Sequence, residues 1–195
     1  MQGLGGSSMN KRLLYALAAS IMPLMVCSGM VYSVLSIYFS QDLGASTTQI
    51  GAVFMIGAAA GALMSPSTGK LSDRVGRRAV LLASMVGFTL AFALYAFIND
   101  VVQAALIQLL EGSTWAGMGS AASAYIADVA GEGERGWAMG VYHRVYYLGW
   151  IIGPILGGYL ADVVGFRNMF LIGSSLIVIG ILILLFFVKE TRPRS

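Results

Sequence analysis

Glu111 and Arg144 are the residues of this sequence best placed to do chemistry, because each carries a charge inside a long apolar run. A charged side chain in the middle of a membrane costs roughly 2.5–3.5 kcal/mol, so it usually faces a polar cavity or a partner. At about 1.5 Å per helical residue, Glu111 lies roughly 15 Å along its run from Val101, and Arg144 roughly 12 Å from Gly136. The similar depths predict an ion pair or a shared proton site; a fixed structural pair is the alternative.

A buried carboxylate is suited to binding and releasing a proton, because desolvation disfavours its charged form while a nearby cation favours that form. We therefore interpret Glu111 as the protonatable group and Arg144 as the residue that tunes it. His143 is a further candidate for proton coupling, because an imidazole changes charge near neutral pH. As the neighbour of Arg144 it points about 100° away around a helix.

Several aromatic and polar residues could line a pocket for an aromatic or cationic compound, through apolar and cation–π contacts. Some of them recur at a spacing of four, and Trp115 lies one helical turn beyond Glu111 on the same face. Packing within a helical bundle would explain the same pattern. The candidates are Tyr32, Ser36, Gln108, Trp115, Tyr142, Tyr146 and Trp150.

The composition indicates that these residues sit in membrane-spanning helices. Hydrophobic residues make up 57% of the 195 positions and charged residues 11%, and the mean hydropathy is +0.79. A helix needs about 20 apolar residues to cross a membrane. Six runs meet that length: Leu13–Phe39, Gln49–Thr68, Ala79–Ile98, Val101–Ala127, Gly136–Ala161 and Asn168–Val188. The sequence therefore predicts an all-α membrane domain of six transmembrane helices over residues 11–195.

The basic residues predict the orientation of these helices. Eleven of the twelve Lys and Arg residues fall on one side of the predicted spans, and Arg167 alone falls on the other. By the positive-inside rule, both termini are expected in the cytoplasm, in a plasma (inner) membrane, and no nucleic acid partner is expected. Residues 1–10, rich in Gly and Ser, are expected to be a disordered tail or a cloning remnant. Four charged residues between the fourth and fifth runs are expected to be solvated: Asp128, Glu132, Glu134 and Arg135.

Two segments of the chain share one pattern of residues. Gly69, Asp73, Gly76 and Arg78 follow the second run, and Gly158, Asp162, Gly165 and Arg167 follow the fifth at the same spacing, 89 positions later. We interpret the chain as two three-helix repeats, over about 11–98 and 99–190. Because three is odd, the second repeat crosses the membrane in the opposite direction from the first.

The segment from Gly69 to Arg78 resembles a family signature. Its letters, GKLSDRVGRR, are similar to the loop between the second and third helices of the major facilitator superfamily. Glycines permit a tight turn there and the basic residues hold it in the cytoplasm. The resemblance implies a gating or conformational role for this segment, carried by Gly69, Asp73, Arg74, Gly76, Arg77 and Arg78.

A second string, in the fifth run, looks like the motif of the drug:proton antiporters in that family. It comprises Gly149, Gly153, Pro154, Gly157 and Gly158. Glycines at a spacing of four allow another helix to approach closely, and a proline bends a span.

The resemblance covers the chain from Lys11 to Arg194, but family members usually have twelve or more helices, so the chain corresponds to an N-terminal half. It implies a secondary transporter that works by alternating access and exports small organic or drug-like compounds in exchange for protons. One feature departs from the family pattern: Gln108, four residues before Gly112, stands where the family often has Arg. This departure puts antiporter-like coupling in doubt.

A parallel homodimer of half-transporters would restore the usual twelve helices. We expect the glycine stripe of the fifth run to pack against Gly57 and Gly61 in the second run of the mate, and Asp73 to face the start of the mate's fifth helix. Two alternatives are a fragment or split-gene half that needs a different C-terminal half, and a membrane interaction protein that does not transport.

No enzymatic or metal-site motif occurs in the sequence. It contains no phosphate loop ending in Lys-Ser/Thr, no Gly-x-Ser-x-Gly, and a single His and a single Cys. These features argue against an ATP-driven pump, a hydrolase and a metal centre. We expect no enzyme activity, cofactor or metal; the expected partners are membrane lipid, protons, a small-molecule substrate and a second half.

Overall fold

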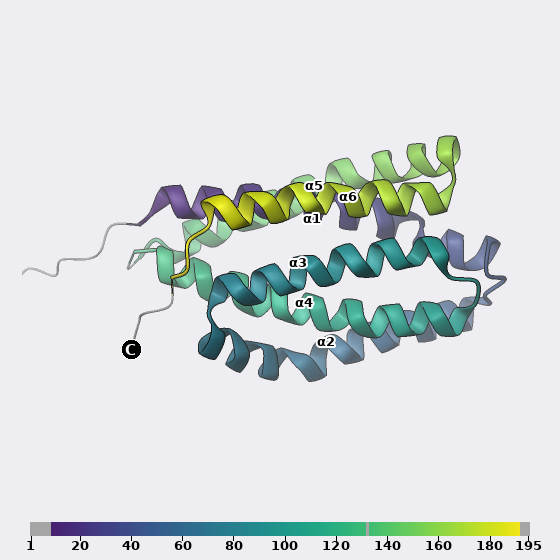
Figure 1. Ribbon diagram of the computed structural model, residues 1–195, viewed down its shortest axis with the longest axis horizontal. Helices are drawn as coiled ribbons and strands as arrows, with labels where there is room; N and C mark the ends of the chain where they lie inside the picture. The colour runs from purple at the N-terminus through teal and green to yellow at the C-terminus, as the bar shows by residue number, and fades with distance from the viewer. Residues whose placement is uncertain (1–8, 132, 192–195) are drawn as a thin grey trace, which may run out of the picture.

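The described part of the chain folds into six long α-helices, as predicted (Figure 1). The computed structural model describes residues 9–131 and 133–191. The helices are α1 (Lys11–Gln41), α2 (Thr47–Val75), α3 (Arg77–Leu94), α4 (Val101–Val129), α5 (Arg135–Val164) and α6 (Phe166–Phe187), with a short 3₁₀ helix η1 (Tyr95–Phe97) after α3.

Three of the helices, α1, α2 and α4, begin at side-chain caps that the sequence provides. The Asn10 side chain accepts a hydrogen bond from Leu13 N at 3.2 Å, and the Asp100 side chain accepts one from Gln103 N at 2.9 Å. Such caps satisfy backbone donors that have no partner within the helix. Asn10 also donates its backbone N–H to the carbonyl of Val129. The fold thus includes Asn10, whereas the sequence predicts a tail over residues 1–10. Residues 1–8 of that tail, Glu132, Arg192 and Arg194 lie outside the described residues.

The turns after α2 and α5 are shorter than the sequence suggested. Each is a single glycine: Gly76 has φ 112° and ψ 150°, and Gly165 has φ 84° and ψ 160°. L-residues with a side chain rarely adopt positive φ, so glycine is required at both positions. Gly69 and Asp73 consequently lie inside α2 rather than in a loop. The two equivalent glycines, 89 positions apart, thus form the same one-residue turn in the two halves of the chain.

The helices pack in two groups of three. The first group is α1, α5 and α6, and the second is α4, α2 and α3; α3 and α6 join the groups (Figure 1). Exchanging α1–α3 with α4–α6 reproduces the same pairs, as expected for an inverted repeat.

Equivalent side chains in the two repeats also make equivalent contacts. Arg78, at the start of α3, donates to the carbonyl of Leu185 near the end of α6 at 2.6 Å. Arg167, at the start of α6, donates to Oδ1 of Asn99 beyond the end of α3 at 3.2 Å.

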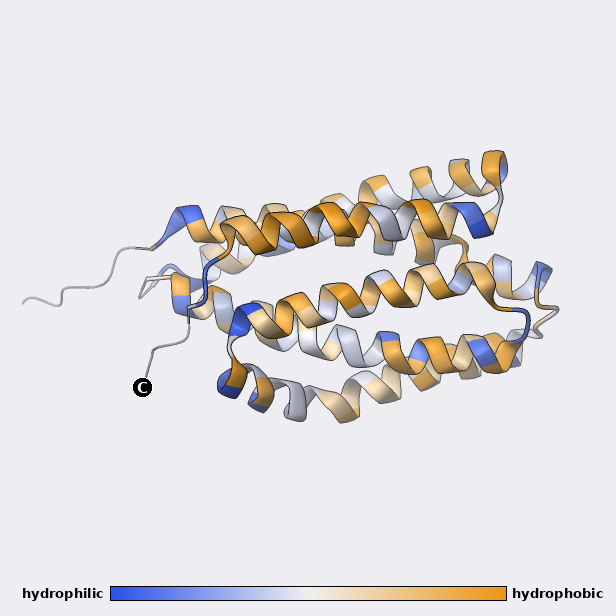
Figure 2. Cartoon of the chain, viewed as in Figure 1, coloured by the Kyte–Doolittle hydropathy of each residue, from blue (hydrophilic) through white to orange (hydrophobic). Residues whose placement is uncertain are grey.

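Five of the helices are long and apolar enough to cross a membrane: α1, α2, α3 with η1, α5 and α6. Figure 2 shows their apolar residues along the bundle and polar residues gathered at its two ends. The helix α4, with 29 residues, is long enough to span a membrane but is less apolar than the other five. Its middle contains Gln108, Glu111 and Thr114, all buried inside the bundle. A helix shielded from lipid by its neighbours can carry polar side chains that a lipid-facing helix cannot.

Glycines lie where two helices of this chain approach each other closely. Gly149, Gly153 and Gly157 lie against α1, where a Cβ on Gly153 would approach the Cα of Gly29 to 2.7 Å. Gly57 and Gly61 lie against Gly112 of α4. The prediction that these two glycine faces meet across a dimer is therefore wrong, because helices of the same chain already cover both.

Candidate functional site

Glu111 lies at the centre of the bundle and is 0% exposed. Its Oε2 accepts a hydrogen bond of 2.9 Å from the hydroxyl of Tyr95, and its Oε1 has no hydrogen-bond partner in the described part of the chain. The predicted ion pair with Arg144 is not formed, since both ion pairs among the described residues belong to Arg77. Arg144 is exposed on α5 because its position faces away from α1.

A cavity of about 300 Å³ lies between α1, α2 and α4, and its lining includes residues of α4 on both sides of Glu111 but not Glu111 itself. Gln108 and Trp115, each about one turn from Glu111 on α4, both line it. The complete lining is Tyr32, Phe54, Gly57, Ala58, Gly61, Gln108, Gly112 and Trp115. Three predicted pocket residues, Tyr32, Gln108 and Trp115, therefore share one cavity.

Aromatic side chains from three helices continue this cavity wall. The Tyr32 ring stacks on Phe54 of α2, with centroids 6.4 Å apart, and on Trp150 of α5, with centroids 6.0 Å apart. Trp150 in turn stacks on Tyr146 at 6.1 Å. The indole N–H of Trp115 donates to the Tyr32 hydroxyl at 3.2 Å. The row of rings therefore crosses from α2 through α1 to α5.

The other predicted site residues lie outside this row. Tyr142 is half-buried and its ring contacts His143 edge to face at a centroid distance of 5.6 Å. His143 and Ser36 are exposed.

Two buried donors near the cavity lack partners. Gln108 is 3% exposed, and its Nε2 makes no hydrogen bond within the described residues; the same holds for the buried Nε1 of Trp150. A buried polar atom without a partner costs about 1–3 kcal/mol. A compound with an acceptor group and a flat apolar body would satisfy Gln108 and stack on the aromatic wall.

Tyr95 and Phe54 belong to this site, but the sequence did not indicate them. Both lie in other helices than Glu111, and no fixed spacing relates side chains on separate helices. The signal available for Tyr95 was a hydroxyl at the end of an otherwise apolar run, because a buried tyrosine usually finds a hydrogen-bond partner.

The family-like segment forms a charge network at the end of the bundle that holds Gly76. Arg77 pairs with Asp73 at 2.7 Å and with Asp128 of α4 at 3.3 Å. The backbone N–H groups of Arg77 and Arg78 donate to the Glu190 carboxylate at 2.9 and 3.2 Å. Glu190 thus caps α3, which has no cap of its own because Gly76 precedes it.

Asp128 is exposed, as expected from the sequence, but it also has fixed partners. Besides the contact with Arg77, it accepts a hydrogen bond of 2.9 Å from the Thr191 hydroxyl. The fold brings the end of α4 beside the segment after α6, and this proximity supplies its partners. Arg74 is exposed and Gly69 half-buried on the same helix as Asp73.

The comparison with known families matches residues 17–195 to the Major Facilitator Superfamily. The chain belongs to this superfamily. It is accordingly a multi-pass integral membrane protein of a family of transporters rather than enzymes. Among the described residues, no group of three His, Cys, Asp or Glu side chains could hold a metal ion.

Its relatives include proteins named for drug resistance. The chain is 36% identical over 140 residues to "Multidrug resistance protein MdtG" of Dickeya zeae, an alignment that covers 72% of this chain and 34% of that protein. It is 28% identical over 156 residues to "Multi-drug resistance efflux pump PmrA" of Streptococcus pneumoniae, covering 78% and 39%. The matches thus span little more than a third of these curated relatives.

A solved structure shares the fold. The human organic anion transporter MFSD10 superposes with a TM-score of 0.73 at 21% identity, over 94% of this chain and 48% of that one. At this identity the likeness establishes the fold alone. The six helices correspond to about half of that transporter.

Proposed function

We propose that this chain is one half of a secondary transporter that works by alternating access and exports small organic compounds in exchange for protons. The observation that carries the proposal is Glu111, a fully buried carboxylate with one unpartnered oxygen beside an aromatic cavity. A purely structural bundle gains little from such a residue, because it costs roughly 2.5–3.5 kcal/mol in the middle of a membrane.

Glu111 binds the coupling proton in this proposal. The protonated, neutral form suits a site closed from water, and the charged form suits a site open to it, so the protonation state can follow the conformation. Tyr95 holds Oε2, which leaves Oε1 as the oxygen that exchanges the proton. His143 and Arg144 are both exposed on α5, and the proposed coupling rests on Glu111 alone.

The substrate is a flat, lipophilic compound. Tyr32, Trp115 and Trp150 offer ring faces that suit aromatic or cationic groups. Gln108 adds one polar anchor to an otherwise apolar wall. The names of the relatives, which refer to multidrug resistance and efflux, support export of such compounds.

The second half is either another copy of this chain or a complementary chain. The outer face of α5 carries large apolar side chains, with Ile155 75% exposed. A six-helix half begins and ends on one side of the membrane, so two copies already have the parallel orientation that the superfamily fold requires. The basic residues favour the cytoplasm for both termini.

A flux assay tests the transport proposal. The purified chain in proteoliposomes is expected to transport ethidium when a pH gradient drives it. Glu111→Gln is expected to abolish this transport while the protein stays folded. Glu134→Gln, which changes an exposed carboxylate at the start of α5, is the matched control and should transport normally. Unchanged proton-driven flux in folded Glu111→Gln would rule out the proposed role.

The mass of the assembly tests how the second half is supplied. In nanodiscs or by native mass spectrometry, a homodimer runs at twice the 20.6 kDa of one chain. A monomer without transport would favour a complementary half, and co-expression with that half should then restore flux.

A further inference from the structure

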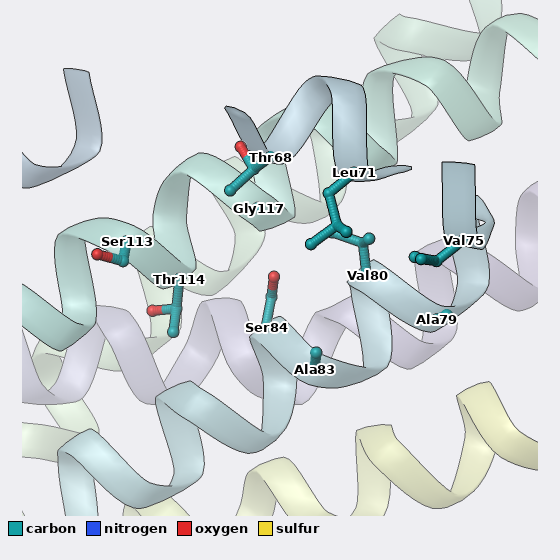
Figure 3. Close-up of a pocket in the computed structure, with 10 residues that line it drawn as sticks. All are labelled: Thr68, Leu71, Val75, Ala79, Val80, Ala83, Ser84, Ser113, Thr114 and Gly117. Carbon is teal, nitrogen blue, oxygen red and sulfur yellow. The ribbon is translucent and has the colours of Figure 1, made fainter. Parts of the chain in front are cut away.

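A second hollow, separate from the aromatic cavity, lies between α2 and α3 (Figure 3). It encloses about 250 Å³ and shares no lining residue with the cavity beside Glu111. Its lining is Thr68, Leu71, Val75, Ala79, Val80, Ala83, Ser84, Ser113, Thr114 and Gly117. We call this hollow the α2–α3 groove.

The groove opens outward from the bundle. Leu71 and Val75 on its α2 wall are 48% and 53% exposed, whereas Val80 and Thr114 on its floor are buried. The helices α2 and α3 meet at Gly76 and have few contacts beyond it, so α4 forms the bottom of the wedge between them. In a membrane such an opening faces lipid.

Ser84 supplies a polar group without a partner inside the groove. It is 5% exposed, its hydroxyl points into the hollow (Figure 3), and it makes no hydrogen bond within the described part of the chain. The hydroxyls of Thr68 and Thr114, by contrast, bond to carbonyls of their own helices at 3.1 and 2.7 Å. A ligand in the hollow with an acceptor atom would accept a hydrogen bond from this hydroxyl and would be stabilised there.

Two basic residues lie on α2 next in sequence to the residues that line the groove. Lys70 and Arg74 follow one stripe of α2, beside the stripe of Leu71 and Val75. At about 1.5 Å per residue, Lys70 and Ser84 each lie roughly 10 Å from the Gly76 turn.

The apolar part of the groove extends beyond these polar groups. Gly117 lies about 18 Å from the end of α4 at Val129, counted at 1.5 Å per residue, and Ser113 lies deeper still. The groove therefore runs from a basic entrance, past a hydroxyl, towards the middle of the membrane. This sequence of environments matches an amphiphile with a negative head.

We propose that the α2–α3 groove binds one anionic glycerophospholipid from the leaflet on the side of Gly76. The phosphate lies near Lys70 and Arg74, an ester carbonyl accepts a hydrogen bond from Ser84, and an acyl chain lies along Val80 towards Ser113. Charge complementarity selects the anionic head, because basic residues near a membrane surface attract anionic lipids.

Native mass spectrometry of the purified chain tests this proposal with two lipids, palmitoyl-oleoyl phosphatidylglycerol and the zwitterionic palmitoyl-oleoyl phosphatidylcholine. One phosphatidylglycerol is expected to remain bound per chain. Ala83→Trp, which fills the groove from its exposed wall, should remove it. Val86→Trp, on the same helix, 51% exposed and outside the lining, is the matched control and should retain it.

Two further variants separate the polar contacts. Ser84→Ala breaks no hydrogen bond of the described residues, so it should weaken retention of both lipids without lowering the melting temperature. Lys70→Gln should reduce the preference for phosphatidylglycerol about fivefold, the usual contribution of one basic residue near anionic lipid.

Equal retention by the Ala83→Trp and Val86→Trp variants would overturn the proposal, as would equal binding of the two lipids by the unaltered chain. A loss of dimers in Ala83→Trp with no lipid bound to the unaltered chain would assign the groove to a second copy instead. These results do not depend on transport by Glu111, so either proposal can fail alone.

Discussion

The hydroxyl of Tyr95 donates a 2.9 Å hydrogen bond to Oε2 of Glu111, and this bond joins the end of the α3 span to the middle of α4. By distance and angle Oε1 has no hydrogen-bond partner among the described residues, although the Tyr32 hydroxyl also interacts with this carboxylate. Tyr95 itself is 0% exposed, and its carbonyl accepts a bond from the Tyr38 hydroxyl at 2.9 Å. Oε2 therefore has a fixed hydrogen-bond donor, whereas Oε1 has no hydrogen bond of ordinary geometry among the described residues.

Removing the Tyr95 hydroxyl is expected to destabilise the fold. Tyr95→Phe keeps the ring but leaves Glu111 without its hydrogen bond, which should cost about 1–3 kcal/mol in the free energy of unfolding. Chemical unfolding in detergent measures the loss. In a Glu111→Leu background the same change should cost much less, because the buried acceptor is gone; equal costs in both backgrounds would show that the bond contributes nothing.

The contact between α1 and α5 makes Gly153 sensitive to a single methyl group. A Cβ at this position would lie 2.7 Å from the Cα of Gly29, so Gly153→Ala should separate the helices and lower the melting temperature by several degrees. Gly158→Ala is the matched control: no atom lies within 4 Å of its Cβ position, and alanine is about 1 kcal/mol better than glycine in a helix. A loss of stability in the Gly158 variant equal to that in the Gly153 variant would contradict this account.

The two glycine turns are expected to differ in their tolerance of alanine. Gly165→Ala adds backbone strain of about 1–3 kcal/mol, because φ is 84° and no atom obstructs the new Cβ. Gly76→Ala adds a similar strain at φ 112° and also displaces the carboxylate of Glu190. Thermal unfolding should therefore rank Gly76→Ala as the more destabilising variant, and the reverse order would exclude a role for Glu190.

Glu190 is expected to stabilise the start of α3. Its carboxylate accepts from the backbone N–H groups of Arg77 and Arg78, and loss of such a cap typically costs about 0.5–2 kcal/mol. Glu190→Ala should lower stability by that amount in chemical unfolding, and it should raise hydrogen exchange at the first turn of α3. Exchange at the start of α4, which Asp100 caps, serves as the internal control and should not change.

The sequence indicates which residues of α1 and α4 come together, while their role in binding stays a prediction. Tyr32, Gln108 and Trp115 were assigned to a pocket, and they share one cavity in the structure. Gln108 and Trp115 both reach this cavity because residues about one turn from Glu111 on a helix lie on its face, whatever surrounds that helix. Ser36 and His143 were assigned by the same spacing rules but are exposed, because spacing does not say which face of a helix is covered.

The pairings across helices could not be predicted from spacing. Equal depth in the membrane suggested Arg144 as the partner of Glu111, but depth leaves the rotation of each helix undetermined. Rotation places Tyr95 against the carboxylate and turns Arg144 outward. In the same way, the glycine stripe of α5 predicts a close contact with another helix, but only the structure shows that this helix is α1 of the same chain.

The sequence by itself determined the six helices, the repeat of 89 positions and the superfamily, because hydropathy, glycine turns and short motifs are local properties of the chain. The tertiary structure decided which side chains meet: Tyr95 with Glu111, Glu190 with the start of α3, and Asp128 with Arg77. These contacts depend on how whole helices rotate and approach one another. That arrangement is set by the packing of all six helices together, and no local pattern encodes it.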